Sequence, residues 1–171
     1  MIKSSVLFAL RPRLRPKPTR PVRVLAIDPG CTESAYVLYD ATEERIDAHG
    51  KVPNEEMRSI MRSYRADDTI DDCAIEMVAC YGMPVGAEVF ETCLMIGQLM
   101  ETWRTRPALV YRREVKLHLC GNVRANDSNI RQALIDRFGA PGTKKTPGAT
   151  YGITKDCWQA LGVAVTYADG V

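Results

Sequence analysis

The sequence predicts an α/β fold in which a five-stranded mixed sheet is flanked by helices. Three closely spaced, branched apolar runs in residues 22–52 are separated by short polar stretches, a pattern typical of an antiparallel meander. Further along the chain, apolar runs alternate with amphipathic segments, which favours parallel strands joined by helices. The 171 residues are 46% hydrophobic and 26% charged, an ordinary globular composition, so one compact domain is expected.

The first predicted strand is VRVLAI at 22–27. It ends at the turn sequence Asp-Pro-Gly, which places Asp28 at the carboxyl end of the strand. Residues 34–40 and 45–52 have the same strand character and are joined by a short polar stretch. These three segments are the strands of the predicted meander.

Two helices and one strand are predicted in the middle of the chain. Asn54 is expected to cap the first helix, because the apolar residues that follow are spaced for one helix face. The fourth strand is DDCAIEMVA at 71–79, a run too short for a typical helix, and Glu76 falls inside its apolar part. A long amphipathic helix follows over residues 85–104 and is closed by Pro107.

A strand, two helices and a loop are predicted in the last third. Asp127 or Ser128 is expected to cap the first of these helices, and Gly139 to end it. Four glycines and two prolines predict the loop. These elements are a fifth strand ALVYRREV at 108–115, a helix over 127–138, a loop over 139–152 and a final helix from residue 154 or 155 to about 168.

Residues 1–21 are predicted to form a flexible basic arm ahead of a single domain over residues 22–171. The sequence up to Arg23 holds seven basic residues and no acidic one, and four prolines interrupt it. The remaining 16 basic and 21 acidic residues give the body a formal charge of −5, although the whole chain carries +2. The arm is either a solvated tail or a segment that contacts nucleic acid, and its arginine-rich start also resembles a mitochondrial transit peptide.

Composition excludes several classes of protein. No stretch approaches the roughly 20 consecutive apolar residues that cross a bilayer, so neither a membrane span nor a membrane partner is expected. The six cysteines are scattered and form no CxxC pair, which argues against a disulfide framework or a zinc site. Reduced thiols favour a cytoplasmic location, in a bacterial or phage-infected cell.

Three carboxylates interrupt or end apolar segments: Asp28, Glu76 and Asp156. Because a buried ionised carboxylate needs a cation, acids that converge at strand ends favour a hard divalent metal. Three such ligands suit two-metal phosphodiester cleavage, in which two Mg²⁺ ions about 4 Å apart act on the water and the leaving oxygen. A purely structural role is the alternative for Asp28 in a turn and for Asp156 at a helix start, and it is weakest for Glu76.

Four segments together resemble the RuvC-type Holliday junction resolvases, most closely the short versions carried by bacteriophages and prophages. They are AIDPG at 26–30, AIE at 74–76, VKLHLCGNVRANDSNIRQALIDRFG at 115–139 and KDCWQALGVAVTYAD at 155–169. The resemblance implies an RNase H-like nuclease domain over residues 22–171 and a homodimer with two active sites. It also implies Mg²⁺ or Mn²⁺, two ions per site, and symmetric nicking of four-way DNA junctions.

The resemblance assigns catalytic residues as well. It implies that Asp28 binds both ions, that Glu76 binds one and that Asp156 binds the other. It places Lys116 near the scissile phosphate, as a further catalytic residue.

One position departs from the family pattern. The family commonly carries an acid three residues after Asp156, and here that position is Gln159. Either three carboxylates suffice, or another acid takes the place of the missing one. Asp127 is a candidate by residue type, but capping a helix is its favoured interpretation.

The basic residues that bind DNA are expected to gather on one face of the acidic body. Arg124 is the expected replacement for a second family lysine, which aligns with Asp127. An ordinary solvated loop is the alternative for the two lysines of the glycine-rich segment. The DNA-binding candidates are Arg112, Arg113, Lys116, Arg124, Lys144 and Lys145.

An aromatic residue is expected to stack on bases at the junction crossover. The family phenylalanine three residues after the strand glutamate is Ala79 here, which leaves Tyr81 as the nearest replacement and Met83 as a weaker one. Packing within the turn is the alternative role for Tyr81. His49 and His118 are isolated in the sequence and are expected to be structural or exposed.

The expected function is that of a metal-dependent, structure-selective crossover junction endodeoxyribonuclease, which resolves four-way DNA junctions. The first alternative is a nuclease of the same fold that acts on flaps, other branched DNA or RNA. The second is a noncatalytic junction-binding protein, an interpretation that rests only on Gln159. An actin-like phosphotransferase also begins with an apolar strand and a similar turn, but 171 residues leave no room for its second domain.

Overall fold

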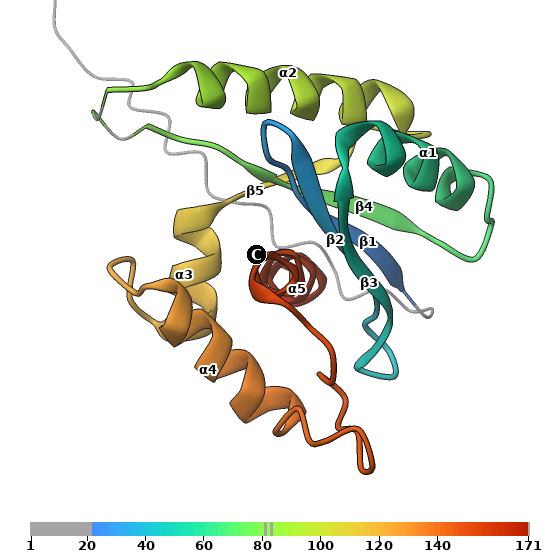
Figure 1. Ribbon diagram of the computed structural model, residues 1–171, viewed down its shortest axis with the longest axis vertical. Helices are drawn as coiled ribbons and strands as arrows, with labels where there is room; N and C mark the ends of the chain where they lie inside the picture. Colours follow the sequence, from blue (N-terminus) through green and yellow to red (C-terminus); the bar gives the residue numbers. More distant parts are fainter. Residues whose placement is uncertain (1–21, 81, 83, 171) are drawn as a thin grey trace, which may run out of the picture.

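The computed structural model describes residues 22–80, 82 and 84–170 and has the predicted α/β architecture. The predicted arm, Tyr81 and Met83 lie outside the described residues. The strands are β1 (Arg23–Asp28), β2 (Glu33–Asp40), β3 (Arg45–Pro53), β4 (Asp72–Met77) and β5 (Ala108–Tyr111) (Figure 1). The helices are α1 (Asn54–Arg65), α2 (Ala87–Thr102), α3 (Arg112–Cys120), α4 (Asp127–Phe138) and α5 (Lys155–Ala168).

The five strands form one mixed sheet in the order β3-β2-β1-β4-β5. The β1–β2 and β2–β3 pairs are antiparallel, while the β1–β4 and β4–β5 pairs are parallel, so the predicted meander and mixed sheet are confirmed. In the β1–β4 pair Ile27 lies opposite Ile75. The next residues are Asp28, the last of β1, and Glu76, the last but one of β4, so both lie at the carboxyl ends of neighbouring parallel strands.

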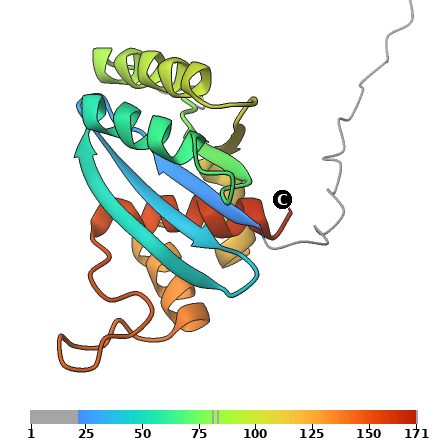
Figure 2. The ribbon, with the colours of Figure 1, turned by 90° about the vertical axis from the view of Figure 1, so that its right-hand side faces the viewer.

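Helices cover both faces of the sheet (Figure 2). On one face lies α5, with α3 and α4 packed around it, and on the other lie α1 and α2. Because side chains alternate along a strand, β1 contributes to both cores. Val24 and Ala26 pack with α5, whereas Leu25 and Ile27 pack with α1 and α2.

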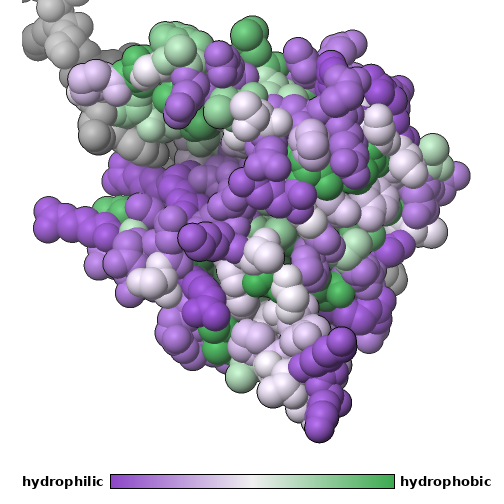
Figure 3. All heavy atoms as spheres, viewed as in Figure 1, coloured by the Kyte–Doolittle hydropathy of each residue, from purple (hydrophilic) through white to green (hydrophobic). Residues whose placement is uncertain are grey.

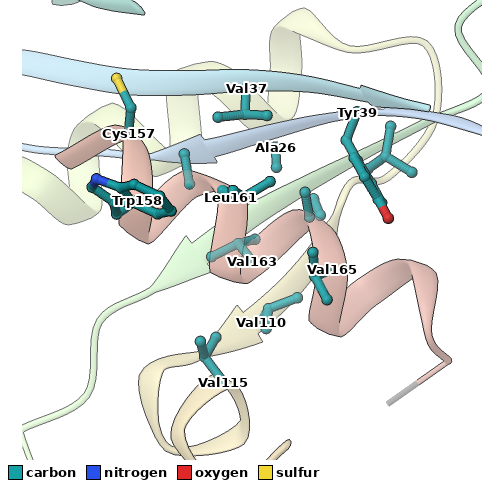
Figure 4. Close-up of a cluster of buried hydrophobic side chains, with 14 of the residues drawn as sticks. Ala26, Val37, Tyr39, Val110, Val115, Cys157, Trp158, Leu161, Val163 and Val165 are labelled. Carbon is teal, nitrogen blue, oxygen red and sulfur yellow. The ribbon is translucent and has the colours of Figure 1, made fainter. Parts of the chain in front are cut away.

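Helix α5 is buried on all sides over most of its length. Ten consecutive residues from Cys157 to Thr166 are buried, a pattern typical of a helix in the interior of a domain. Figure 4 shows Leu161 and Val163 among apolar side chains of the sheet and of α3. A Cβ added at Gly162 would lie 3.0 Å from Val115 Cγ1, so glycine at this position lets α3 pack closely against α5.

The predicted fifth strand is wrong in its second half. Strand β5 ends at Tyr111, and Arg112 begins α3, which the sequence analysis did not predict. Glu114 stabilises the start of this helix, because its Oε2 accepts a hydrogen bond of 2.7 Å from the backbone N of Tyr111. Gly121, with φ of 62°, ends the helix in the left-handed conformation that favours glycine.

Two predicted helix caps are also wrong. Pro53 precedes α1, and the side chain of Asn54 instead donates to the carbonyls of Gly30 and Cys31 at 3.0 and 3.1 Å. The cap of α4 is Asn126, whose Oδ1 accepts a hydrogen bond of 3.0 Å from the backbone N of Asn129. Capping by Asn126 leaves the carboxylate of Asp127 available for other contacts.

The predicted end of α4 at Gly139 is confirmed, and so is the loop that follows. Within this loop Gly142 and Pro147 form an isolated antiparallel bridge, which makes residues 142–147 a tight hairpin. All six cysteines are free, as the sequence predicts. No helix in the described part of the chain is both long and apolar enough to span a bilayer.

Candidate active site

A cleft of about 830 Å³ lies where β1 and β4 end and where α4 and α5 begin. It brings together Asp28, Glu76 and Asp156, the three acids predicted to bind metal, and also Asp127 and Gln159. The cleft is lined by Asp28, Glu76, Arg112, Asp127, Ser128, Arg131, Ile153, Thr154, Lys155, Asp156, Trp158 and Gln159. Acidic groups from four separate elements therefore share one space with basic side chains.

Asp28 is the electrostatic centre of the cleft. Its pKa is raised to about 8, above all by burial and also by the charges of Glu76, Asp156 and Asp127, against the lowering effect of Arg112. Burial also raises the pKa of Glu76, against the lowering effect of Arg112. The raised pKa values mean that nearby positive charge does not compensate the ionised forms of Asp28 and Glu76. A bound cation would supply that charge.

Arg112 links two of the acids. Its Nη1 lies 3.3 Å from Glu76 Oε2, and its Nη2 donates a hydrogen bond to Asp127 Oδ1. Arg112 is the first residue of α3, so the helix that the sequence analysis missed is the element that positions this guanidinium. Asp127 points to Arg112 because Asn126 has taken over the capping of α4.

Lys51 of β3 is a basic residue of the site that the sequence analysis missed. Its Nζ lies 2.9 Å from Asp156 Oδ2 and 3.1 Å from Glu33 Oε2. Lys51 pairs with Ala35 on β2, and Ala35 pairs with Asp28 on β1, so Lys51 and Asp28 lie in one row across the sheet. Only the strand register reveals this row, because Lys51 belongs to a polar segment with no motif of its own.

Gln159 lies one helical turn after Asp156, on the same side of α5. It is 9% exposed, and its Oε1 has no hydrogen-bond partner among the described residues. A buried acceptor without a partner is uncommon in folded proteins and indicates a group that is satisfied by something else. Here that acceptor belongs to a residue that lines the cleft.

The donor set fits a hard divalent cation. Carboxylate and amide oxygens are the ligands of Mg²⁺ and Mn²⁺, whereas sulfur and imidazole would favour zinc. As they stand, no three Asp, Glu, His or Cys side chains of the described residues are grouped closely enough to hold an ion. Arg112 and Lys51 already pair with three of the acids, Glu76, Asp127 and Asp156.

The other predicted DNA-binding residues lie around the cleft or further away. Lys116 follows Arg112 by one turn of α3 and is not part of the cleft lining. Its positive charge lowers the pKa of Glu76, but less than Arg112 does and against the larger effect of burial. Arg113 and Arg124 are exposed outside the lining. Lys144 and Lys145 are exposed within the hairpin of the 139–152 loop.

Two further basic residues of the lining were not predicted. Arg131 of α4 lies over the ring of Trp158, with 5.4 Å between its Cζ and the ring centroid, and Lys155 begins α5. The two histidines were expected to be structural or exposed, and neither belongs to the lining of the cleft. His118 Nε2 lies 2.8 Å from Asp169 Oδ2, and the ring of His49 lies close to Gly152.

Comparisons by sequence give no match, either to a protein-family model or to a curated protein. Comparison with solved structures finds RuvC of Thermus thermophilus, with a TM-score of 0.65 and 16% sequence identity, over 86% of this chain and 94% of that chain. This protein has the RuvC fold. The predicted RNase H-like architecture is thereby confirmed.

A second RuvC structure from the same organism is in complex with a Holliday junction substrate. It matches with a TM-score of 0.64 and 15% identity, over 86% of this chain and 93% of that chain. The RuvC match thus spans most of this chain and nearly the whole of the matched chains. Identity of 15–16% carries the fold alone, so the activity of this chain is inferred from its own residues.

Proposed function

We propose that this protein is a metal-dependent, structure-selective endonuclease that resolves four-way DNA junctions by paired symmetric nicks during recombination, repair or phage DNA processing. The observation that carries the proposal is the single cleft in which Asp28, Glu76 and Asp156 meet, in a chain with the RuvC fold. The proposal includes an origin among the short bacteriophage and prophage versions of these enzymes. It also includes action in a reducing cytoplasm, which the six free cysteines support.

The acids of the cleft would hold two Mg²⁺ or Mn²⁺ ions. Asp28, whose pKa is raised by the charges of both other carboxylates, would contact both ions, with Glu76 on one and Asp156 on the other. When bound, such ions supply an activated water and neutralise charge on the leaving oxygen of a phosphodiester. Burial of Asp28 and Glu76 supports the assignment, because it creates a demand for positive charge that a divalent cation meets.

Basic residues of the cleft would bind the DNA backbone. Arg112, Arg131 and Lys155 lie beside the acids, where they would hold phosphates on either side of the reacting one. Lys116 would contact the scissile phosphate from the next turn of α3. Arg113, Arg124, Lys144 and Lys145 would extend this contact along the DNA arms, and Tyr81 would stack on bases at the crossover.

A homodimer is part of the proposal, because a junction with two-fold symmetry requires two active sites to cut both strands. Figure 3 shows apolar residues gathered over the first half of α2. Phe90 and Leu94 are 61% and 68% exposed there, an unusual exposure for large apolar side chains on one helix. This face of α2, with Val85 at its edge, is where the second subunit would pack.

The test is cleavage of a labelled four-way junction beside linear duplex, flap and RNA–DNA hybrid substrates, with Mg²⁺, Mn²⁺ or EDTA. Wild type is compared with Asp28→Asn and with Asp136→Asn, a matched change of an exposed acid on α4 outside the cleft lining. Metal-dependent nicks confined to the junction, lost in Asp28→Asn and kept in Asp136→Asn, are expected. Thermal melting establishes that the variants are folded.

Other outcomes select the alternatives. Equal cutting of flaps or hybrids would replace junction resolution with a broader nuclease of the same fold. Tight junction binding without cutting under any metal condition would identify a noncatalytic junction-binding protein.

A further inference from the structure

The start of α4 places an unexpected carboxylate in the cleft. If Asp127 capped α4, its carboxylate would bind the backbone of the helix. Asn126 caps α4 instead, and Asp127 accepts a hydrogen bond from Arg112. Its charge also acts on both Asp28 and Glu76, and it raises the pKa of each after burial. Asp127 is thus a fourth acid of the same electrostatic group, on a different element from the other three.

Gln159 independently indicates that the cleft binds a cation. Its amide oxygen is buried in the lining of the cleft and has no hydrogen-bond partner among the described residues. An amide oxygen accepts hydrogen bonds and also binds hard cations, so a cation at the adjacent acids would satisfy it. Asp156, one turn earlier on α5, lies in the same lining.

Arg112 now provides the positive charge that these acids need. It is the cation closest to Glu76 and Asp127 among the described contacts, and it pairs with both at once. A divalent ion that binds both carboxylates has to take the place of this guanidinium. Once released, Arg112 is free to bind a backbone phosphate, which is the other anion that a planar guanidinium suits.

We propose that Asp127 and Gln159 complete the cation site of this protein, with Asp127 supplying the fourth carboxylate and Gln159 a neutral oxygen, and that Arg112 is the counterion that a bound divalent cation displaces. The inference rests on the proposed metal-dependent function, and it concerns which residues of this chain bind the cation. The family pattern has an acid on α5 at the position of Gln159. In this chain, Asp127 on α4 would supply the carboxylate and Gln159 on α5 a neutral oxygen.

The test measures Mn²⁺ binding to the DNA-free protein by electron paramagnetic resonance of free Mn²⁺. Asp127→Asn should weaken binding by about tenfold, the usual scale for loss of a group that shapes a metal site. Asp136→Asn on the same helix should bind as wild type does. Unchanged Mn²⁺ affinity in Asp127→Asn would overturn the assignment of Asp127.

A rescue experiment separates a ligand role from a merely structural one. The double variant Asp127→Asn with Gln159→Glu returns the lost carboxylate from α5 and should recover most of the Mn²⁺ affinity. Arg112→Gln removes the competing cation and should strengthen Mn²⁺ binding, while it weakens junction binding. Failure of the rescue, or weaker Mn²⁺ binding in Arg112→Gln, would refute the corresponding part of the proposal.

Asp28→Asn separates this inference from the proposed function. If Asp28→Asn abolishes Mn²⁺ binding and Asp127→Asn leaves it unchanged, only the inference fails. If wild type itself binds no Mn²⁺ above the level of Asp28→Asn, the metal-dependent function fails as well.

Discussion

Lys51 on β3 and Asp156 on α5 form an ion pair, with 2.9 Å between Lys51 Nζ and Asp156 Oδ2. The pair joins the antiparallel edge of the sheet to the first turn of the buried helix. Hydrogen bonds to Asp156 and Glu33 raise the pKa of Lys51, so the lysine stays charged at any physiological pH. Because both side chains are about 40% exposed, the pair contributes little to stability and acts mainly on the charge of Asp156.

Replacement of Lys51 should therefore change the metal requirement. In wild type, a divalent ion that binds Asp156 has to compete with Lys51. Lys51→Met removes this competition, so half-maximal junction cleavage is expected at a lower Mn²⁺ concentration. Titration of cleavage against Mn²⁺ measures the effect. Arg45→Met, which removes a cation paired with Asp40 and Asp47 at the other end of β3, should leave the Mn²⁺ requirement unchanged. A higher requirement in Lys51→Met would mean that the lysine positions Asp156.

The raised pKa of Asp28 predicts a pH-dependent stability. The pKa rises from 3.8 to about 8 on folding, so the folded state binds a proton that the unfolded chain has lost. The free energy of unfolding of the metal-free protein should fall as pH rises between these values, by at most about 1.4 kcal/mol per pH unit from this group.

Thermal melting in EDTA between pH 6 and pH 8 measures this dependence. Asp28→Asn should flatten it, because the amide does not titrate. Saturating Mn²⁺ should also flatten it in wild type, because the metal-bound folded state then holds Asp28 ionised, as the unfolded chain does. Equal slopes for wild type and Asp28→Asn in EDTA would contradict the assignment.

Close packing of α3 on α5 predicts that Gly162 does not accept a larger side chain. Gly162→Val forces Val115 away and should lower the free energy of unfolding by about 1–3 kcal/mol, as overpacked cores do. Urea denaturation measures this change. Gly97→Val on α2 is the matched control, since a Cβ added there has no atom of the described residues within 4 Å apart from its chain neighbours and the backbone of its own helix. Valine favours a helix more than glycine does, so the control should not lose stability. An equal loss in both variants would show that contact with Val115 does not set the cost.

The apolar face of α2 predicts the oligomeric state. Leu94→Arg places a charge on a side chain that is 68% exposed in one subunit, and it should convert the dimer to a monomer with little change in subunit stability. Sedimentation equilibrium measures the mass. Leu117→Arg changes a leucine of α3 that is 55% exposed and should leave the dimer intact. A monomeric wild type, or a dimeric Leu94→Arg, would refute this interface.

The hairpin lysines predict a salt effect. Alanine at both Lys144 and Lys145 should weaken junction binding equally for all sequences and reduce the slope of log affinity against log salt by about two, if each contacts one phosphate. Fluorescence anisotropy over a salt series measures the slope. The Mn²⁺ affinity of the DNA-free protein should stay the same. An unchanged slope would assign these lysines to solvent.

Much of the fold follows from short-range patterns. The apolar run before Asp-Pro-Gly predicts β1 and places Asp28 correctly, and the isolated Glu76 in an apolar strand indicates the second acid. Helix α3 escaped prediction because the apolar run ALVY continues into RREV without a glycine or proline to mark a boundary, while Val115 in fact packs against Gly162. A single helix face and a single strand face are indistinguishable over so few residues.

The site was harder to predict than the fold. Asp28, Glu76 and Asp156 stand out because each is an acid in an apolar context. Lys51 and Arg112 act through partners far away in the sequence, and strand register and helix boundaries decide which acids they meet. The role of Asp127 depended on which residue caps α4. Asn126 and Asp127 are equally good caps by residue type, and in the structure Asn126 is the cap.

Helix α5 begins at the cleft and continues through the core of the domain. Asp156 and Gln159 lie in the first two turns of a helix whose next residues are buried on every side. Fraying beyond the first turn of this helix requires opening the core, so the amide hydrogens that follow Trp158 should exchange with solvent only through global unfolding. The backbone that carries Asp156 and Gln159 is thus held in place for as long as the domain remains folded, so DNA binding does not have to order it.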